Sequence, residues 1–446
     1  METAAEMARA VRDGRASPVE LAEEAIRRAE RWQPVTDAFS HLHPEDALEE
    51  AGRRADEVAV GGELGPLHGV PVAVKDLFDV AGWETTGCCR AYVGTVALAD
   101  ADAVRRLRAA GAVIVGKTNQ HELAAGGTNL VSACGPTRNP WDPGRMTGGS
   151  SGGSGAAVAA RVVPLALGTD TGGSVRIPAS FCGTVGLKPT HGRVSLRGVM
   201  PLAPSMDTVG PLCATAGDAA LALEVLTGEP VAMPPPQSLS VGLVGRFVAP
   251  VRADVGRAAA DGARVLGEAG VPVREIEEGP AYDPEDWERL AWPELFEAHG
   301  HLLERPQDLG GPTRRFLEYG RDLDPAERAA AGTRAAALRR AFLDLLAEVD
   351  ALLVPATLFP APGIERAEME VDGRPVDVLR GAVSLLTRLA NMAGIPAVAF
   401  PAGFSEEGLP LGLQLLGRPG EEGALLSLVT AFQAATDHHL GAPAGP

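Results

Sequence analysis

The sequence predicts an α/β fold built around a largely buried β-sheet. Two short apolar runs, residues 70–74 and 112–115, have the length and the Val/Ile content of buried strands, and they end at Lys75 and Gly116 respectively. A helical stretch over residues 101–110 lies between them. Strands that alternate with helices are typical of a sheet whose faces are both covered, so we expect helices on both sides of it.

The first 60 residues are predicted to form a helical N-terminal region, followed by the α/β domain over residues 61–446. Ser17 and Glu20 have the spacing of a capping box, and Pro18 occupies the first helical position. These signals begin a helix that follows a shorter one at the N-terminus.

The remaining elements are predicted from periodicity and turn signals. Asp324 is expected to cap a long Ala-rich helix, with Glu327 as its capping-box partner. The Pro-rich stretch 230–237 is the best candidate for a hinge or linker. Predicted helices cover residues 44–60, 156–163, 218–226, 253–269 and 325–349, and predicted strands cover residues 165–168, 239–244, 351–354 and 397–400.

Composition and charge exclude several classes of protein. The 446 residues are 45% hydrophobic and 22% charged, as in ordinary globular domains. The net charge of −18 repels a phosphate backbone, so we expect no nucleic-acid partner. Five cysteines without the spacing of a zinc site indicate reduced thiols and no metal. Because the sequence shows neither the apolar core of a signal peptide nor a run long enough to span a bilayer, we expect a cytoplasmic protein without membrane contact.

A Gly/Ser-rich run at residues 148–155, GGSSGGSG, is the first candidate for chemistry. Taken alone, it fits a flexible linker equally well. It lies between a turn and an apolar helix, however, and Ser174, in a second Gly-rich turn, follows Ser150 by 24 residues. A serine nucleophile needs a base, a neighbour that holds it and donors for its oxyanion. Because the glycines before Ser174 let several backbone N–H groups converge on one oxygen, we interpret both turns as parts of one catalytic site.

Lys75 is the best candidate for the base. None of the nine histidines shares a local motif with either serine. Lys75 ends an apolar strand, where burial lowers the pKa of a lysine from about 10.4. Reaching about 7–8 corresponds to roughly 4 kcal/mol of destabilisation of the charged form. The alternative is a structural lysine paired with Asp76 or Asp79, and the two serine motifs favour the catalytic role.

Taken together, these segments resemble the amidase-signature family over nearly the whole chain. Residues 230–350 are the weakest part of the match. The resemblance implies a large mixed β-sheet core covered by helices on both faces, with a variable substrate-pocket region at about residues 230–390. The matching segments are GVPVAVKD at 69–76, GKTN at 116–119, NPW at 139–141, GGSSGG at 148–153, DTGGSVRIP at 170–178, FCGTVGLKPT at 181–190, NMAGIP at 391–396 and GLPLGLQ at 408–414.

The resemblance implies a Ser-Ser-Lys catalytic triad. Ser174 is then the nucleophile, Ser150 the bridging serine and Lys75 the ultimate base. Ser151 is adjacent to Ser150, but the register of the family motif favours Ser150. In the family, a cis peptide accompanies the bridging serine. No metal or organic cofactor is implied.

The same resemblance suggests which backbone groups surround the substrate. The N–H groups of Thr171, Gly172, Gly173 and Ser174 are expected to hold the oxyanion of an acyl-enzyme mechanism, and Ala124 is expected to border the substrate. We interpret Asp170 and Arg176 as supports of this loop.

These motifs do not identify the amide. We expect an amidase that converts a small carboxylic amide to the carboxylate and ammonia or an amine. The first alternative is the glutaminase (A-type) subunit of a tRNA-dependent amidotransferase, and the second is a carbamoyl-type hydrolase of allophanate- or biuret-like compounds. The glutaminase subunit holds the glutamine amino group with an aspartate, and this chain has Ser384 at that position, seven residues before Asn391. A hydroxyl cannot supply the same charge complementarity. Arg314 or Arg315 falls roughly where that subunit binds the carboxylate.

The substrate pocket is expected in residues 285–330 and 355–390, where the motif match is weakest. Its aromatic side chains either line an apolar acyl pocket or pack between helices, and we favour packing. They are Trp287, Trp292, Phe296, Phe316 and Tyr319. The sequence leaves the oligomeric state open; a homodimer through the N-terminal helices is compatible with the family.

Overall fold

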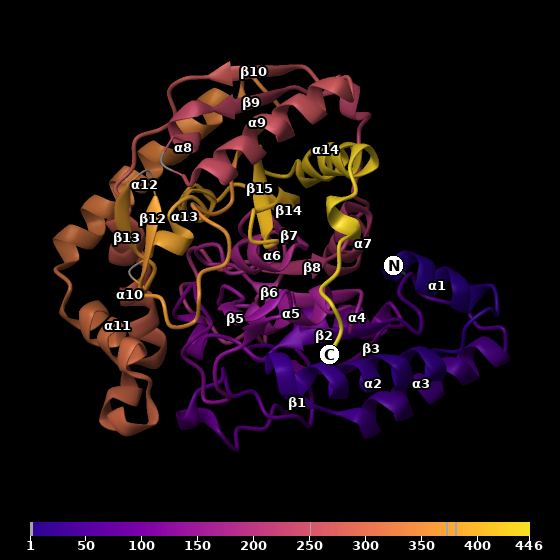
Figure 1. The fold of residues 1–446 in the computed structure, drawn as a ribbon. Helices are drawn as coiled ribbons and strands as arrows, with labels where there is room; N and C mark the ends of the chain where they lie inside the picture. Colours follow the sequence, from indigo (N-terminus) through magenta and orange to yellow (C-terminus); the bar gives the residue numbers. More distant parts are fainter. Residues whose placement is uncertain (1–2, 250, 372, 380) are drawn as a thin grey trace.

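The computed structural model describes residues 3–249, 251–371, 373–379 and 381–446. Over these residues the chain forms an eleven-stranded mixed sheet with helices packed against it, which confirms the predicted fold class (Figure 1). The strand order is β1-β3-β2-β6-β8-β7-β14-β15-β11-β9-β10. Two further pairs, β4-β5 and β12-β13, form small separate sheets.

The strands agree with the sequence predictions where those were made. The strands of the large sheet are β1 (Phe39–Leu42), β2 (Pro71–Lys75), β3 (Val113–Thr118), β6 (Leu165–Thr169), β7 (Val185–Lys188), β8 (Val209–Cys213), β9 (Val241–Val244), β10 (Val273–Ile276), β11 (Ala351–Pro355), β14 (Ala397–Phe404) and β15 (Pro410–Gly417). The small sheets contain β4 (Arg138–Asn139), β5 (Asp142–Met146), β12 (Glu368–Val371) and β13 (Arg374–Asp377).

The helices surround this sheet in the ribbon drawing (Figure 1). They are α1 (Ala4–Arg12), α2 (Pro18–Thr36), α3 (Pro44–Ala59), α4 (Asp102–Ala109), α5 (Gly152–Ala159), α6 (Arg176–Cys182), α7 (Ala216–Thr227), α8 (Gly245–Val248), α9 (Ala253–Glu268), α10 (Glu285–His299), α11 (Gly311–Asp322), α12 (Pro325–Leu346), α13 (Arg388–Met392) and α14 (Glu422–Ala435).

Strand β2 shows how both faces of the sheet are covered. All five of its residues are buried, and it pairs in parallel with β3 and β6. Val72 and Val74 join a hydrophobic cluster with residues of α4 and α7, whereas Ala73 joins a different cluster with residues of α2 and α5. Because side chains alternate along a strand, this division places helices on opposite faces.

Helix α5 begins four residues earlier than predicted, at Gly152 rather than at residue 156. The prediction excluded the glycines because glycine lowers helix stability. Packing overrides this preference here, because all eight residues of α5 are buried. A β-carbon at Gly153 would overlap the backbone oxygens of Ala38 and Asn119, so only glycine fits at this position.

The N-terminal region contributes to the sheet as well as to its helical cover. Its capping box at Ser17 and Glu20 is formed as predicted. Between α2 and α3, however, β1 pairs antiparallel with β3 and becomes an edge of the main sheet. The predicted division of the chain at residue 60 stays a prediction.

Helix α12 is capped by Asp324, as predicted, although in a different way. The Asp324 carboxylate accepts a hydrogen bond from the N–H of Ala326, at 2.8 Å. The N–H of Glu327 instead donates to the Asp324 carbonyl, at 3.0 Å. This cap therefore forms at the second helical position, through a different N–H from the one a capping box uses.

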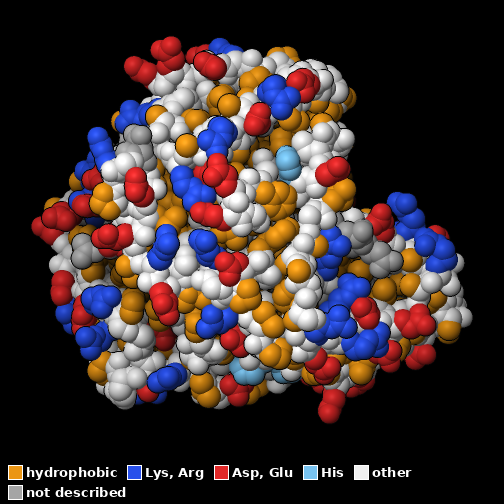
Figure 2. Space-filling model, viewed as in Figure 1, with side chains coloured by type: hydrophobic (Ala, Val, Ile, Leu, Met, Phe, Trp, Pro, Cys, Tyr) orange, Lys and Arg blue, Asp and Glu red, His pale blue; other side chains and the backbone are white. Residues whose placement is uncertain are grey.

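The surface mixes charges of both signs. On the face drawn in Figure 2, acidic and basic side chains are interspersed, with apolar groups between them. No helix in the described part of the chain is both long enough and apolar enough to cross a membrane.

Candidate active site

Lys75 and Ser150 form a hydrogen-bonded pair inside the protein. Lys75 is the last residue of β2, and Thr169 is the last residue of the neighbouring parallel strand β6, so both side chains emerge at the same edge of the sheet. Lys75 Nζ donates to Ser150 Oγ at 2.6 Å and to Thr169 Oγ1 at 2.8 Å. Lys75 and Ser150 are both 0% exposed. The structure thus brings together two of the three predicted catalytic residues, 75 positions apart in the sequence.

Burial lowers the pKa of the Lys75 amine. Removal of the ammonium from water lowers the pKa of Lys75 to about 7, although the carboxylates of Asp207 and Asp170 oppose the shift. A lysine with this pKa is largely unprotonated just above neutral pH and is able to accept a proton from a hydroxyl.

The backbone around Ser150 connects the two serine turns. The peptide between Gly149 and Ser150 is cis, as the family resemblance implies. The N–H of Ser151 donates to the carbonyl of Ser174 at 3.1 Å, so the two turns are in direct contact. Ser174 is 7% exposed, whereas Ser150 is fully buried. Ser174 is therefore the most exposed of the three predicted catalytic residues.

Ser151 has a different role from Ser150. Its hydroxyl donates to the carbonyl of Thr169 at 3.2 Å and receives a bond from the N–H of the same residue at 3.3 Å. Ser151 therefore ties α5 to the end of β6, while Ser150 contacts Lys75. This geometry agrees with the register that favours Ser150.

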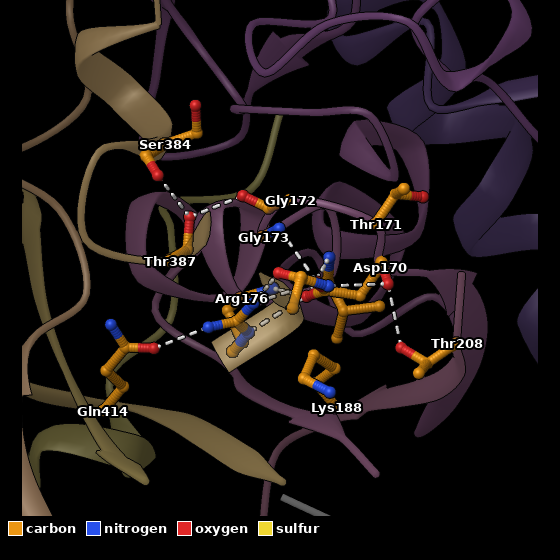
Figure 3. Close-up of polar contacts among 12 residues, drawn as sticks. Asp170, Thr171, Gly172, Gly173, Arg176, Lys188, Thr208, Ser384, Thr387 and Gln414 are labelled. Carbon is orange, nitrogen blue, oxygen red and sulfur yellow. Dashed lines mark hydrogen bonds and ion pairs between the residues drawn. The ribbon is translucent and has the colours of Figure 1, made fainter. Parts of the chain in front are cut away.

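The side chain of Asp170 stabilises the turn of residues 170–174 through hydrogen bonds to its backbone (Figure 3). The Asp170 carboxylate accepts bonds from the N–H groups of Gly173, at 2.8 Å, and Val175, at 3.2 Å. The predicted oxyanion donor Gly173 therefore has its N–H occupied by Asp170. This arrangement leaves Thr171, Gly172 and Ser174 as the predicted donors that the carboxylate does not engage.

Two residues that the motifs did not single out as part of this turn hold its other side. Thr387 Oγ1 donates to the Gly172 carbonyl at 2.7 Å (Figure 3). Trp287 Nε1 donates to the Thr171 carbonyl at 2.8 Å, and a β-carbon at Gly172 would lie 2.8 Å from the Trp287 ring. These contacts fix the orientation of the Thr171 and Gly172 carbonyls. No local sequence signal marks such partners, which lie more than 110 positions away.

The other predicted pocket residues divide between the site and the helix packing. Ala124 lies on the loop whose Gly127 carbonyl accepts a bond from the N–H of Gly149, next to Ser150. Trp292 stacks on Phe316 with ring centroids 4.2 Å apart, which joins α10 to α11 as expected for packing. Trp287, by contrast, contacts the turn of residues 170–174.

A buried ion pair supports this turn. Arg176 and Asp170 are both 0% exposed, and their atoms Nη2 and Oδ1 are 2.9 Å apart. Arg176 also donates to Gln414 Oε1 at 2.8 Å and to Asn391 Oδ1 at 2.7 Å. Burial would by itself raise the pKa of Asp170, but the Arg176 guanidinium, the charge of Lys188 and the bond from Asn391 together outweigh burial and lower the pKa to about 2. Asp170 is therefore ionised at any working pH, and both residues support the loop as predicted (Figure 3).

Replacing Arg176 by methionine is expected to lower the free energy of unfolding by about 3–5 kcal/mol, because it leaves the Asp170 carboxylate buried and unpaired. Chemical denaturation of wild type and variant measures this loss. The double variant Asp170→Asn, Arg176→Met should recover part of it, since no unpaired charge remains. A single variant as stable as the wild type would show that the pair does not hold the turn.

The described residues contain no group of three or more His, Cys, Asp or Glu side chains arranged to hold a metal ion. The candidate site consists instead of hydroxyl, amine and backbone N–H groups.

Comparison with known proteins shows to which family this chain belongs. The family model "Amidase" matches residues 20–426. The A-type subunit of the glutamyl-tRNA(Gln) amidotransferase of Methylococcus capsulatus is 37% identical, over all of this chain and 99% of that protein. The corresponding protein of Symbiobacterium thermophilum is 38% identical with equal coverage.

Solved structures give the same result. An amidase crystal structure superimposes with a TM-score of 0.92 at 38% identity, over 97% of this chain and 99% of that one. A vestigial protein complex that reveals the evolutionary origins of an s-triazine catabolic enzyme gives 0.91 at 34% identity, over 97% and 98%. The A-type subunit of the glutamyl-tRNA(Gln) amidotransferase of Thermotoga maritima gives 0.76 at 29% identity, over 93% and 91%. The chain belongs to the amidase family and is a hydrolase that acts on amide C–N bonds.

Proposed function

We propose that this protein hydrolyses a carboxylic amide through an acyl-enzyme on Ser174, with Ser150 and Lys75 as a proton relay. The observation that carries the proposal is the 2.6 Å hydrogen bond between Lys75 Nζ and Ser150 Oγ at full burial. A buried amine that contacts a serine hydroxyl is the activated arrangement that nucleophilic catalysis requires.

In this mechanism, protons first move from Ser174 to Ser150 and from Ser150 to Lys75. Neutral Lys75 takes the proton of Ser150 while Ser150 takes that of Ser174, and Ser174 Oγ attacks the amide carbonyl carbon. When the tetrahedral intermediate collapses, the C–N bond breaks and Ser150 returns a proton to the leaving nitrogen, resupplied by Lys75. Water then attacks the acyl ester by the same relay, which releases the carboxylate and regenerates Ser174.

Backbone N–H groups stabilise the oxyanion in this proposal. Thr171, Gly172 and Ser174 supply the donors, while Asp170 holds the Gly173 N–H and fixes the turn. Each preorganised donor of this kind is worth about 3–4 kcal/mol of barrier. Trp287 and Thr387 anchor the carbonyls on the opposite side of the turn.

The curated relatives support glutamine as the amide. They are amidotransferase subunits named for a glutamyl-tRNA, and they align with this chain over nearly their whole length. On this evidence the glutaminase alternative is favoured over the small-amide interpretation. The same relatives count against the expectation of no nucleic-acid partner. That expectation rested on the net charge alone, and an acidic subunit can contact RNA as part of a larger complex.

A specific observation supports the stand-alone or carbamoyl-type hydrolase as the second candidate. Ser384, where the glutaminase subunit has its aspartate, is 6% exposed, and its carbonyl accepts a bond from Thr387, the residue that holds the Gly172 carbonyl (Figure 3). Position 384 thus lies beside the turn of residues 170–174 through its carbonyl, and its hydroxyl donates to the Gly381 carbonyl at 3.1 Å. The higher TM-scores of the amidase and of the vestigial complex point the same way.

Ammonia release from a panel of amides separates these candidates. The panel spans glutamine, asparagine, short aliphatic and aromatic amides and biuret-like compounds, with Ser174→Ala as the blank. Turnover of simple or carbamoyl amides with glutamine idle would identify a stand-alone hydrolase. Turnover of glutamine alone would identify the glutaminase subunit. Hydrolysis that persists in the Ser174→Ala variant would refute the mechanism for every substrate.

The relay predicts a rise in activity with pH. Because Lys75 must be neutral to accept a proton, and its pKa is lowered to about 7, kcat/KM should fall about tenfold per pH unit below that value and level off above it. A profile from pH 5 to 9 on a neutral amide measures this. A flat profile between pH 5.5 and 8 would mean that Lys75 does not donate or accept the proton.

A further inference from the structure

Asp207 is a buried carboxylate beside the candidate site that the proposed relay does not use. It lies two residues before β8 and is 6% exposed. Its carboxylate accepts hydrogen bonds from the N–H groups of Leu202, at 3.0 Å, and Ala203, at 3.1 Å. It also accepts one from Thr171 Oγ1, at 2.5 Å. Among the described residues no lysine, arginine or histidine forms a salt bridge with Asp207, so hydrogen bonds satisfy this carboxylate, and one of them comes from the turn of residues 170–174.

The pairing of two strands brings Asp207 to this turn. Strand β6 pairs antiparallel with β8. Asp170 and Thr208 continue this pairing beyond the strand ends, because the N–H of each donates to the carbonyl of the other, at 2.8 and 3.1 Å. Thr208 Oγ1 also donates to the Asp170 carbonyl, at 2.9 Å (Figure 3). Thr171 and Asp207 come next along the two segments, so the antiparallel register places them opposite each other.

Thr171 is held at two points. Its hydroxyl donates to Asp207, and its carbonyl accepts a bond from Trp287 Nε1 at 2.8 Å. The two bonds fix the side chain of Thr171 and the peptide that follows it, which restricts rotation about its Cα and so orients its own N–H. A donor that is oriented before the reaction costs no reorganisation when an oxyanion forms.

We propose that Asp207 is a positioning residue for amide hydrolysis, which fixes the N–H of Thr171 for the oxyanion through the hydroxyl of that residue. The inference rests on the proposed function, in which this N–H is one of the oxyanion donors. Because such a donor acts on charge that develops only in the transition state, losing its orientation should lower kcat and kcat/KM together and leave KM nearly unchanged.

The charge of Asp207 also affects the base of the proposed relay. Lys75 Nζ donates to Thr169 Oγ1 at the end of β6, two residues before the turn residue that Asp207 holds. The carboxylates of Asp207 and Asp170 both oppose the lowering of the Lys75 pKa by burial. Removing the negative charge of Asp207 should therefore lower the pKa of Lys75 further, so that the amine stays neutral to a lower pH.

Three other titratable groups interact with this pair of residues. Cys88 and His121 interact with Lys75, and Glu294 of α10 interacts with Asp207. Burial raises the pKa of Cys88 and lowers that of His121 to about 3, so both side chains are neutral near pH 7. Burial and, to a smaller extent, Glu294 raise the pKa of Asp207. The variants below leave these three groups in place.

The first arm of the test changes only Thr171, in the full-length protein and on the best amide of the panel. Thr171→Val removes the hydroxyl that Asp207 holds and should lower kcat about 10²-fold, the lower range for losing one oxyanion donor, with KM within a few-fold of wild type. Thr171→Ser keeps the hydroxyl and should stay within a few-fold of wild type in both constants. Circular dichroism with thermal unfolding checks that both variants are folded.

The second arm separates the charge of Asp207 from its hydrogen bonds. In Asp207→Asn the side-chain amide can still accept from the backbone and donate to Thr171 Oγ1, but the negative charge is lost. We expect the acid limb of the kcat/KM profile, measured from pH 5 to 9, to move about one pH unit lower, at the small end of the effect of one nearby opposite charge.

Asp218→Asn is the matched control for this variant. Asp218 is 2% exposed, and its carboxylate accepts bonds from the N–H groups of Ala4 and Ala5, which joins α7 to α1 instead of to the turn. This substitution also neutralises a buried carboxylate, so we expect lower stability with an unchanged pH profile.

Turnover by Thr171→Val at the wild-type rate would overturn the inference, and so would an equal loss in Thr171→Ser. An acid limb that Asp207→Asn leaves in place, or that Asp218→Asn moves equally, would show that the carboxylate only supports the fold. All of these variants keep Lys75, Ser150 and Ser174, so the wild type and its Ser174→Ala blank decide the proposed function separately. A wild type without Ser174-dependent turnover would overturn the proposed function and this inference with it.

Discussion

Ser174→Ala should abolish amide hydrolysis and leave the fold intact. The substitution removes the attacking oxygen, and losing the nucleophile of a serine hydrolase costs about 10⁶-fold in kcat. Ser174 is small, and its carbonyl bond to the N–H of Ser151 is a backbone contact that alanine retains. Ammonia release on the best amide of the panel measures the loss, and circular dichroism with thermal unfolding checks the fold.

Ser151→Ala is the matched control for that variant. It removes a hydroxyl from the adjacent motif position, where the hydroxyl bonds only the Thr169 backbone among the described residues. We expect a loss of about 1 kcal/mol in stability and activity within a few-fold of wild type. If Ser151→Ala were inactive while Ser174→Ala still turned over substrate, the nucleophile would lie elsewhere.

Lys75→Met should lower kcat/KM by about 10⁴-fold, the upper range for losing a positioned base. Methionine fills most of the lysine volume, so the loss reports the missing amine rather than a cavity. Ser150 then keeps its proton and no longer activates Ser174. Steady-state kinetics from pH 6 to 9 measure the loss, which should not be recovered at high pH.

Lys188→Met is the control that separates the effect of the contact with Ser150 from the effect of burying a lysine. Lys188 is also 0% exposed, and burial lowers its pKa to about 7 as well. Its Nζ, however, donates to the Pro189 carbonyl at 2.9 Å instead of to a serine. We expect this variant to change stability more than catalysis. Equal losses in Lys75→Met and Lys188→Met would remove the case for Lys75 as the base.

The contact between Lys75 and Ser150 could be expected from the sequence because both residues lie in short local motifs. The strand that ends at Lys75, the glycines around Ser150 and the turn before Ser174 each lie in a short motif, and the structure confirms the strand and the contact between Lys75 and Ser150. Parallel pairing of β2 with β6 then brings Thr169 to the same edge.

Long-range contacts explain what the sequence did not predict. Trp287 reaches the Thr171 carbonyl from 116 positions away, and no periodicity in α10 distinguishes it from a packing residue such as Trp292. The bond from Gly173 to Asp170 is local, but it depends on the orientation of one peptide, and glycine permits many. The early start of α5 likewise follows from packing against Ala38 and Asn119, which overrides the low helix propensity of glycine.

The substrate preference also depends on long-range contacts that the sequence motifs do not predict. Position 384 lies beside the turn of residues 170–174 because Thr387 Oγ1 contacts both the Ser384 and the Gly172 carbonyls. In the proposed function, a serine in place of an aspartate at this position would remove a negative charge near the substrate while leaving Lys75, Ser150 and Ser174 unchanged. The family motifs therefore identify the reaction more sharply than the amide.

The most direct test of the central claim is to map the covalent adduct formed with a fluorophosphonate, a reagent that labels activated serines. Our account predicts one adduct per chain on the peptide that contains Ser174, formed much more slowly in Lys75→Met and at the wild-type rate in Lys188→Met. An adduct on Ser150 or Ser151, or labelling of Ser174 at an unchanged rate without Lys75, would contradict the proposed relay.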